Sequence, residues 1–359
     1  MTNRLKPKYV SVKQIKNIKA NYTILLGERS NGKSFACKSY AFQECYKNGY
    51  EMIILKRFDL EIKDSMIVNY FSDVPIQEIT EGAYTCIDVY RKEIYLSNID
   101  EKTQKVVHGK KIGYVHSLAS DEHYKSLSYP KVRFIIFEEI VSKDGRYLFN
   151  ECDRLQHYIS TIYRNNVTDG RVIMIGNTIS RICPYYSEWQ LDKIPRQKQG
   201  SVDYYIKHND NGADTTIAVF LTDSLNINTG MFFGNSAKTI TKGAYEVNSY
   251  PHLPESLHRY KILYQFVLEY ENFKFLCQLL ENYEHSDQIT WYIQPKTSDI
   301  KNNTRVFSNK YSLDPMYSTS FKMAYESEKR VISMLLNGQV CYSDNLTGTE
   351  FNNLLHNFT

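Results

Sequence analysis

Residues 27–34 are Gly27, Glu28, Arg29, Ser30, Asn31, Gly32, Lys33 and Ser34, which fit the pattern G-x-x-x-x-G-K-[S/T] at every fixed position. The apolar run 22–26 comes directly before this motif and predicts a buried strand, and residues 34–47 show helical spacing of apolar residues. A glycine-containing turn between a strand and a helix lets backbone N–H groups surround a phosphate, and the helix N-terminus adds positive charge. The stretch therefore predicts a nucleotide-binding P-loop to which all eight residues contribute.

Two side chains of the motif have expected roles in catalysis. Lys33 is expected to reach the β- and γ-phosphates of ATP, and the Ser34 hydroxyl is expected to bind Mg²⁺. A second apolar run, 134–137, ends in Glu138 and Glu139. A carboxylate at the end of such a strand can hold the metal, and the next one can polarise the attacking water. We therefore expect Glu138 to be a metal ligand with Ser34, and Glu139 to be the general base.

Glu138 differs from the usual pattern, because an aspartate is expected at this position. Its longer side chain suggests contact with the metal through a bound water. The alternative for the pair is a strand that simply ends in two solvated acids.

Two further polar residues follow regular elements. Asn177 ends the apolar run 171–176 and is a candidate sensor of the γ-phosphate, although a turn-forming asparagine is the alternative. Arg164 follows a helical stretch and is a candidate arginine finger that acts across a subunit boundary. A surface cation near a helix C-terminus is the alternative for Arg164.

The order of elements predicts an α/β fold with a parallel sheet, because strand, turn, helix and strand follow one another from residue 22 onward. Expected elements are strands at 22–26, 51–55, 132–137, 171–176 and 217–221, and a helix within 146–163. Residues 196–216 are polar, and 222–256 repeat Asn, Gly, Ser and Pro, which indicates a linker. Strands at 260–268 and 289–293 and a helix at 321–336 then predict a smaller α+β domain. The expected division is 1–221, 222–256 and 257–359.

Composition adds little about partners. The formal net charge is +4, from 44 basic and 40 acidic residues, which is too mild to indicate nucleic-acid binding by itself. The seven cysteines form no CxxC pair, which favours a reducing cytoplasm over a disulfide framework. There is no apolar run of 18 residues and no signal-peptide pattern, so no membrane association is expected.

In their order and spacing, the four motifs resemble those of the DNA-packaging ATPases of small podoviruses that infect Gram-positive bacteria. The resemblance covers most of residues 20–190, and a weaker similarity is seen at 333–338. The segments that carry it beyond the motifs are Lys56-Arg57-Phe58, residues 128–132, Tyr163-Arg164-Asn165 and Pro184-Tyr185-Tyr186.

The resemblance implies a P-loop NTPase of the ASCE or RecA-like type, a linker, and a C-terminal domain like a degenerate RNase H-like nuclease. It implies a homomeric ring, typically of five subunits, that uses ATP and Mg²⁺ to drive double-stranded DNA into a viral procapsid through its portal. The location would be the host cytoplasm and, transiently, the procapsid. By this resemblance, Lys33 would bind phosphate and Ser34 would bind the metal. Glu139 would be the catalytic glutamate, Arg164 the trans-acting finger and Asn177 a coupling residue. A structural RNA in the complex is left open.

Two regions carry expectations about DNA. The acids of the C-terminal domain form no D-x-D pattern and are read as surface acids, so a non-cleaving DNA- or capsid-binding role is expected; they are Glu269, Glu271, Asp287 and Asp299. Candidate contacts to the phosphate backbone in the ATPase domain are Lys56, Arg57, Lys105, Lys110, Lys111 and Lys125. An ordinary surface cation is the alternative for each of them and is the favoured reading.

Three other functions compete with a packaging motor. A small-molecule kinase would need an arginine-rich lid, which residues 110–130 do not supply. A nucleotide-binding assembly protein without turnover would not need Glu139. A DNA helicase would share the motor parts, but would prefer single-stranded DNA.

Overall fold

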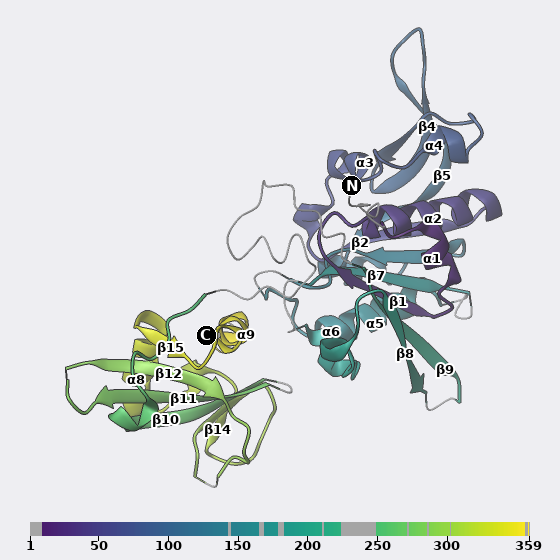
Figure 1. Ribbon diagram of the computed structural model, residues 1–359. Helices are drawn as coiled ribbons and strands as arrows, with labels where there is room; N and C mark the ends of the chain where they lie inside the picture. Colours follow the sequence, from purple (N-terminus) through teal and green to yellow (C-terminus); the bar gives the residue numbers. More distant parts are fainter. Residues whose placement is uncertain are drawn as a thin grey trace.

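The computed structural model describes residues 9–142, 145–164, 169–178, 183–209, 212–223, 249–270, 273–285, 287–301, 303–355 and 358. Two β-sheets organise these residues, a nine-stranded sheet within 22–221 and a six-stranded sheet within 260–342 (Figure 1). All seven cysteines are free thiols. Within the described ranges, no helix is both long and apolar enough to cross a membrane.

The large sheet is parallel at its centre and antiparallel at both edges. Its order is β3-β4-β5-β2-β6-β7-β1-β9-β8. The central strands are β1 (Tyr22–Gly27), β2 (Glu51–Lys56), β6 (Val132–Phe137), β7 (Arg171–Asn177) and β9 (Asp214–Leu221). Strand β7 lies between β1 and β6, so the P-loop, Asn177 and the two glutamates are brought to the same edge. The predicted P-loop α/β fold is confirmed.

Helices cover both faces of this sheet (Figure 1). Helices α1 (Val12–Asn17) and α2 (Lys33–Asn48) pack on one face, and α5 (Glu151–Ile162) and α6 (Pro184–Glu188) on the other. Alternate residues of one strand serve the two layers: Leu25 packs towards α2, while Ile24 and Leu26 pack towards α5. All three are fully buried, which explains why the central strands read as continuous apolar runs.

A large insertion between β2 and β6 was not predicted. It contains η1 (Asp59–Glu61), α3 (Asp64–Tyr70), α4 (Ile76–Ile79), β3 (Cys86–Tyr90), β4 (Glu93–Ile99), β5 (Val106–Ser117) and η2 (Leu118–Tyr124). Strands β4 and β5 form a hairpin that projects from the sheet (Figure 1). The first half of β5 is largely exposed and only its second half is buried, so the sequence shows no continuous apolar run there.

One further strand of this sheet was not predicted. The polar stretch 196–216 contains strand β8 (Ser201–His208), which pairs with β9 as an edge hairpin, and η3 (Ile194–Arg196) precedes it. The helix expected within 146–163 is confirmed as α5, which begins at Glu151 because the preceding Asn150 has a left-handed φ of 50°. Of the expected linker 222–256, residues 224–248 lie outside the described residues.

The second sheet has the order β14-β13-β10-β11-β12-β15. Its elements are η4 (Leu257–Arg259), β10 (Tyr260–Tyr270), β11 (Phe273–Asn282), β12 (Ile289–Pro295), β13 (Val306–Ser308), β14 (Tyr317–Ser318), η5 (Phe321–Met323), α8 (Glu326–Asn337), β15 (Val340–Tyr342) and α9 (Asn345–Leu355). An antiparallel meander, β10-β11-β12, is extended by two parallel strands beside β10 and by β15, which is parallel to β12. Phe266, Trp291, Phe307 and Phe351 fill its core.

Candidate nucleotide site

The P-loop backbone requires glycine at two positions. Gly32 has a φ of +85°, in the left-handed region where a side chain is strained. A Cβ at Gly27 would lie 1.9 Å from Thr222 Oγ1, so the end of β1 can approach the end of β9 only without a side chain. Ser30 also has a positive φ, of 60°. The motif's conformation is thus set by local sterics as well as by the helix that follows.

The side chain of Asn31 stabilises the P-loop through buried hydrogen bonds. Its side chain is buried, and its Nδ2 donates to Thr222 Oγ1 at 2.5 Å, while Thr222 Oγ1 donates to Leu26 O at 3.1 Å. The backbone carbonyl of Asn31 accepts from Val10 N at 3.0 Å. The Asn31 side chain therefore supports the loop, and sequence reasoning had not found its partner Thr222.

Lys33 lies beneath the loop with its ammonium group surrounded by oxygens. Its Nζ donates to Glu28 O at 2.5 Å, Asn31 Oδ1 at 3.1 Å, Gly27 O at 3.2 Å and Asn177 Oδ1 at 3.2 Å. Burial lowers the pKa of Lys33 to about 8, although the negative charge of Glu138 opposes the shift. Lys33 is thus mostly protonated at neutral pH and joins the P-loop to the end of β7.

Ser34 and Glu138 meet at the predicted metal position. The Ser34 hydroxyl donates to Glu138 Oε2 at 3.2 Å, and Tyr70 OH donates to Glu138 Oε1. Glu138 is buried, with 6% of its surface exposed. A hydroxyl and a carboxylate are oxygen ligands of the kind Mg²⁺ prefers, so the donor set fits this ion. Solvated acids at a strand end, the alternative reading, do not describe Glu138.

Glu139 differs from its neighbour because it is exposed and has a left-handed φ of 58°. Arg57 holds this turn: its Nη1 donates to Glu139 O and its Nη2 to Ile140 O, both at 3.0 Å. Arg57 is itself paired with Glu151, from Nε at 2.8 Å and Nη2 at 3.1 Å. Burial by itself would lower the pKa of Arg57, but Glu151 raises it above its ordinary value.

These groups face one cleft of about 390 Å³. It is lined by Arg29, Ser30, Asn31, Gly32, Lys33, Ser34, Phe35, Asp73, Glu138, Glu139, Ile175, Gly176 and Asn177. Gly27 and Glu28 do not line it, but their carbonyls accept from Lys33. The structure therefore brings together the P-loop, both glutamates and Asn177, as the sequence predicted.

Arg164 lies elsewhere. It is exposed just after α5, and its Nη2 donates to Lys125 O at 3.3 Å. It is absent from the cleft of its own chain. Its neighbour Asn165 lies outside the described residues.

Arg57 is neither a candidate DNA contact nor an ordinary surface cation, the two readings that its sequence position offered. Arg57 is only 4% exposed, and its guanidinium is used inside the protein. Two of the candidate lysines also have protein partners, since Lys111 Nζ pairs with Glu93 at 3.0 Å and Lys110 Nζ donates to Tyr46 O at 3.2 Å. Sequence alone does not distinguish a buried cation from an exposed one.

The C-terminal acids include one correction. Glu269, expected on the surface, is buried at the end of β10, pairs with Lys274 at 3.2 Å and accepts from Ser308 Oγ at 3.4 Å. Asp287 and Asp299 are not buried, and Glu271 lies outside the described residues. Among the residues that the structure describes, no three acids, histidines or cysteines are grouped to hold a metal.

The sequence reasoning also missed three residues beside the cleft. Tyr70, which contacts Glu138, and Asp73, which lines the cleft, belong to the insertion, and Lys38 pairs with Asp73 at 2.5 Å. Lys38 stands four residues after Ser34 on α2, which places both on one helix face. No motif marks Tyr70 or Asp73, so no signal in the sequence would have identified them.

Two curated proteins are similar to this chain over part of their length. The DNA packaging protein of Bacillus phage B103 is 31% identical over 169 residues, and that of Bacillus phage phi29 is 29% identical over 164 residues. Each match covers 45% of this chain and spans less than half of the relative, 46% and 44% respectively.

Two solved structures share the fold over almost the whole chain. The bacteriophage Phi-29 viral genome packaging motor assembly aligns with a TM-score of 0.57 and 20% identity over 98% of this chain and 100% of that chain. The Phi-28 gp11 DNA packaging motor aligns with a TM-score of 0.50 and 16% identity over 98% of each chain. A model of the family described as podovirus DNA encapsidation protein (Gp16) matches residues 6–198, more than half of the sequence. The chain therefore belongs to the podovirus DNA encapsidation protein (Gp16) family.

Proposed function

We propose that this protein is a Mg²⁺-dependent ATPase that drives double-stranded DNA into a viral procapsid as one subunit of a homomeric ring. The observation that carries the proposal is the single cleft shared by Lys33, Ser34, Glu138, Glu139 and Asn177 in a chain of this family. The names of the relatives, which describe DNA packaging proteins and packaging motors, support the choice of DNA as substrate.

The residues of the cleft divide the work of phosphoryl transfer. Protonated Lys33 would bind the phosphate oxygens, and the backbone of residues 29–32 would surround them. Ser34 and Glu138 would hold Mg²⁺, which neutralises charge on the phosphates. Glu139, exposed at the cleft and held by Arg57, would orient the attacking water and accept its proton. Asn177, bonded to Lys33, would report the state of the phosphates to β7.

Arg164 and the C-terminal domain would act in the assembled ring. Arg164 is exposed and outside its own cleft, so it would act as a finger in the site of a neighbouring subunit. We propose the division 1–221, 222–256 and 257–359, with a C-terminal domain that binds DNA or capsid without cutting. The ring, with five subunits as the expected number, would dock on the portal in the host cytoplasm.

Steady-state ATP hydrolysis tests this function. Purified protein is assayed with Mg²⁺, alone and with double- or single-stranded DNA, beside Glu139→Gln and the exposed control Glu284→Gln. We expect duplex DNA to stimulate hydrolysis in the wild type and the control, and Glu139→Gln to be about a thousandfold slower. Stronger stimulation by single strands would favour a helicase. Nucleotide binding without turnover would favour an assembly protein.

A further inference from the structure

The end of helix α3 reaches the metal position from the insertion. Tyr70 is the last residue of α3, and its hydroxyl donates to Glu138 Oε1, while Ser34 donates to Glu138 Oε2. Both carboxylate oxygens therefore have a fixed donor.

Glu138 needs such a second donor because of its length. A glutamate has one more rotatable bond than the aspartate expected at this position, so its carboxylate has more rotamers to lose on binding a cation. A hydrogen bond from Ser34 alone would fix one oxygen and leave the other free to turn. Tyr70 removes this freedom before any ligand arrives.

Tyr70 is held in turn by Lys38, which is itself paired with Asp73. Lys38 Nζ lies 4.4 Å from the centre of the Tyr70 ring and donates to Tyr70 O. Lys38 also pairs with Asp73 at 2.5 Å, and Asp73 lines the nucleotide cleft. Because Lys38 and Ser34 share one face of α2, the P-loop helix and the end of α3 are fastened to each other beside the metal position.

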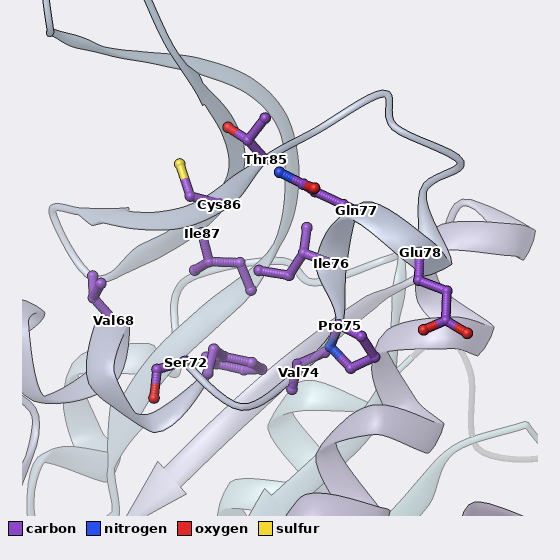
Figure 2. Close-up of a pocket in the computed structure, with 11 residues that line it drawn as sticks. Val68, Ser72, Val74, Pro75, Ile76, Gln77, Glu78, Thr85, Cys86 and Ile87 are labelled. Atoms are coloured by element: carbon purple, nitrogen blue, oxygen red, sulfur yellow. The ribbon is translucent and has the colours of Figure 1, made fainter.

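The other side of the same segment borders a cleft of about 550 Å³ between α3, α4 and β3 (Figure 2). Phe71 and Val74 line this cleft and are 1% and 4% exposed, and Ile76 faces Ile87 across it. Phe71 and Val74 also belong to the buried core on the α2 face of the large sheet, and this packing fixes the backbone that carries Tyr70. The hydroxyl is thus presented by a packed segment.

We propose that Tyr70 is a positioning residue that holds the Glu138 carboxylate beside Ser34, ready for a divalent cation. The proposal rests on the proposed function in one respect, namely that Ser34 and Glu138 receive the Mg²⁺ of a bound nucleotide. It assigns to the insertion a part in building the nucleotide site.

A double-mutant cycle tests the proposal by equilibrium binding. The Mg²⁺ concentration that half-saturates binding of a fluorescent, non-hydrolysable ATP analogue is measured for the wild type, Tyr70→Phe, Glu138→Asp and the double variant. Tyr70→Phe should raise this concentration about tenfold, the effect of losing one hydrogen bond to a charged group. In the Glu138→Asp background the same change should matter less than about twofold, because the shorter carboxylate does not reach the hydroxyl.

The matched control is Tyr95→Phe, which removes a hydroxyl-to-carboxylate hydrogen bond to Glu93 on strand β4, away from the cleft. It should leave the Mg²⁺ dependence unchanged. Binding of the analogue without Mg²⁺ should be the same in Tyr70→Phe and the wild type, which shows that the P-loop is intact.

Two results would overturn the proposal: an unchanged Mg²⁺ dependence in Tyr70→Phe, or an equal loss in both backgrounds, which would mean a general structural effect. If the wild type binds the analogue with Mg²⁺ but hydrolyses no ATP, the proposed function fails while the cycle still decides the role of Tyr70. If Mg²⁺ has no effect on binding by the wild type, both fail.

Discussion

The ion pair between Arg57 and Glu151 makes a quantitative prediction about stability. Both side chains are buried, with 5% and 0% exposed, and Glu151 also accepts from Tyr185 OH at 2.8 Å and Leu148 N at 2.9 Å. Glu151→Gln keeps the size of the side chain but removes its charge. The guanidinium of Arg57 would then be a buried charge without a counterion.

Breaking one partner of a buried ion pair costs about 3–5 kcal/mol. For a sheet domain of this size that corresponds to a fall of roughly 6–20 °C in the midpoint of thermal unfolding. The assay is denaturant and thermal unfolding of the full chain, with Glu284→Gln as the matched control. Glu284 pairs with Arg259 at 2.9 Å on the surface, where 61% and 55% of the two side chains are exposed, so its loss should cost less than about 1 kcal/mol.

A second variant separates stability from catalysis. Replacing both partners, as Arg57→Met with Glu151→Leu, leaves no unpaired charge, but Glu139 O, Ile140 O, Leu148 N and Tyr185 OH lose their partners. Only part of the lost stability should therefore be recovered. Hydrolysis should still be about ten- to a hundredfold slower, since Glu139 O loses its donor and small displacements of a catalytic group are costly. The reasoning would be refuted if Glu151→Gln were as stable as Glu284→Gln.

His116, Arg164 and Glu269 each offer a separate test. His116 Nδ1 lies 2.7 Å from Tyr158 OH, and burial lowers the pKa of His116 to about 3. Because the unfolded chain binds this proton near pH 6.5 and the folded chain does not, the free energy of unfolding should fall by about 2 kcal/mol between pH 7 and 5. Acid unfolding curves of His116→Gln should lack this contribution. Arg164→Ala and Lys33→Ala subunits, each inactive alone, should regain DNA-stimulated hydrolysis when mixed, and a mixture that stays inactive would count against a finger acting in trans. The full chain should not nick supercoiled plasmid with Mg²⁺ or Mn²⁺, because Glu269 is already paired with Lys274. If the wild type nicks the plasmid and Glu269→Gln does not, the C-terminal domain is a nuclease and the prediction is wrong.

The centre of the fold could be predicted because its strands are buried on both faces. Leu25 and Ile135 belong to such strands, and each gives a short apolar run with clear limits. The edge hairpins could not be predicted in the same way. Strand β8 is largely half-buried or exposed and mixes polar with apolar residues, and β5 is exposed over its first half. Their positions follow from pairing with neighbours, which a single sequence does not show.

The site shows the same division. Lys33 and Ser34 could be predicted because phosphate binding demands fixed spacing within one short loop. Tyr70 lies 68 residues from Glu138 in the chain, and its role depends on how the insertion folds back. Arg57 was placed among possible DNA contacts because its charge is visible in the sequence, whereas its partner Glu151 is 94 residues away.

DNA packaging by the assembled motor tests the central claim most directly. Procapsids, the purified protein, double-stranded DNA and ATP are incubated with Mg²⁺, and DNA that resists nuclease digestion is measured for the wild type and Glu139→Gln. We predict protected full-length DNA with the wild type only, and only in the presence of ATP. Unprotected DNA in spite of active, DNA-stimulated hydrolysis would contradict a packaging motor.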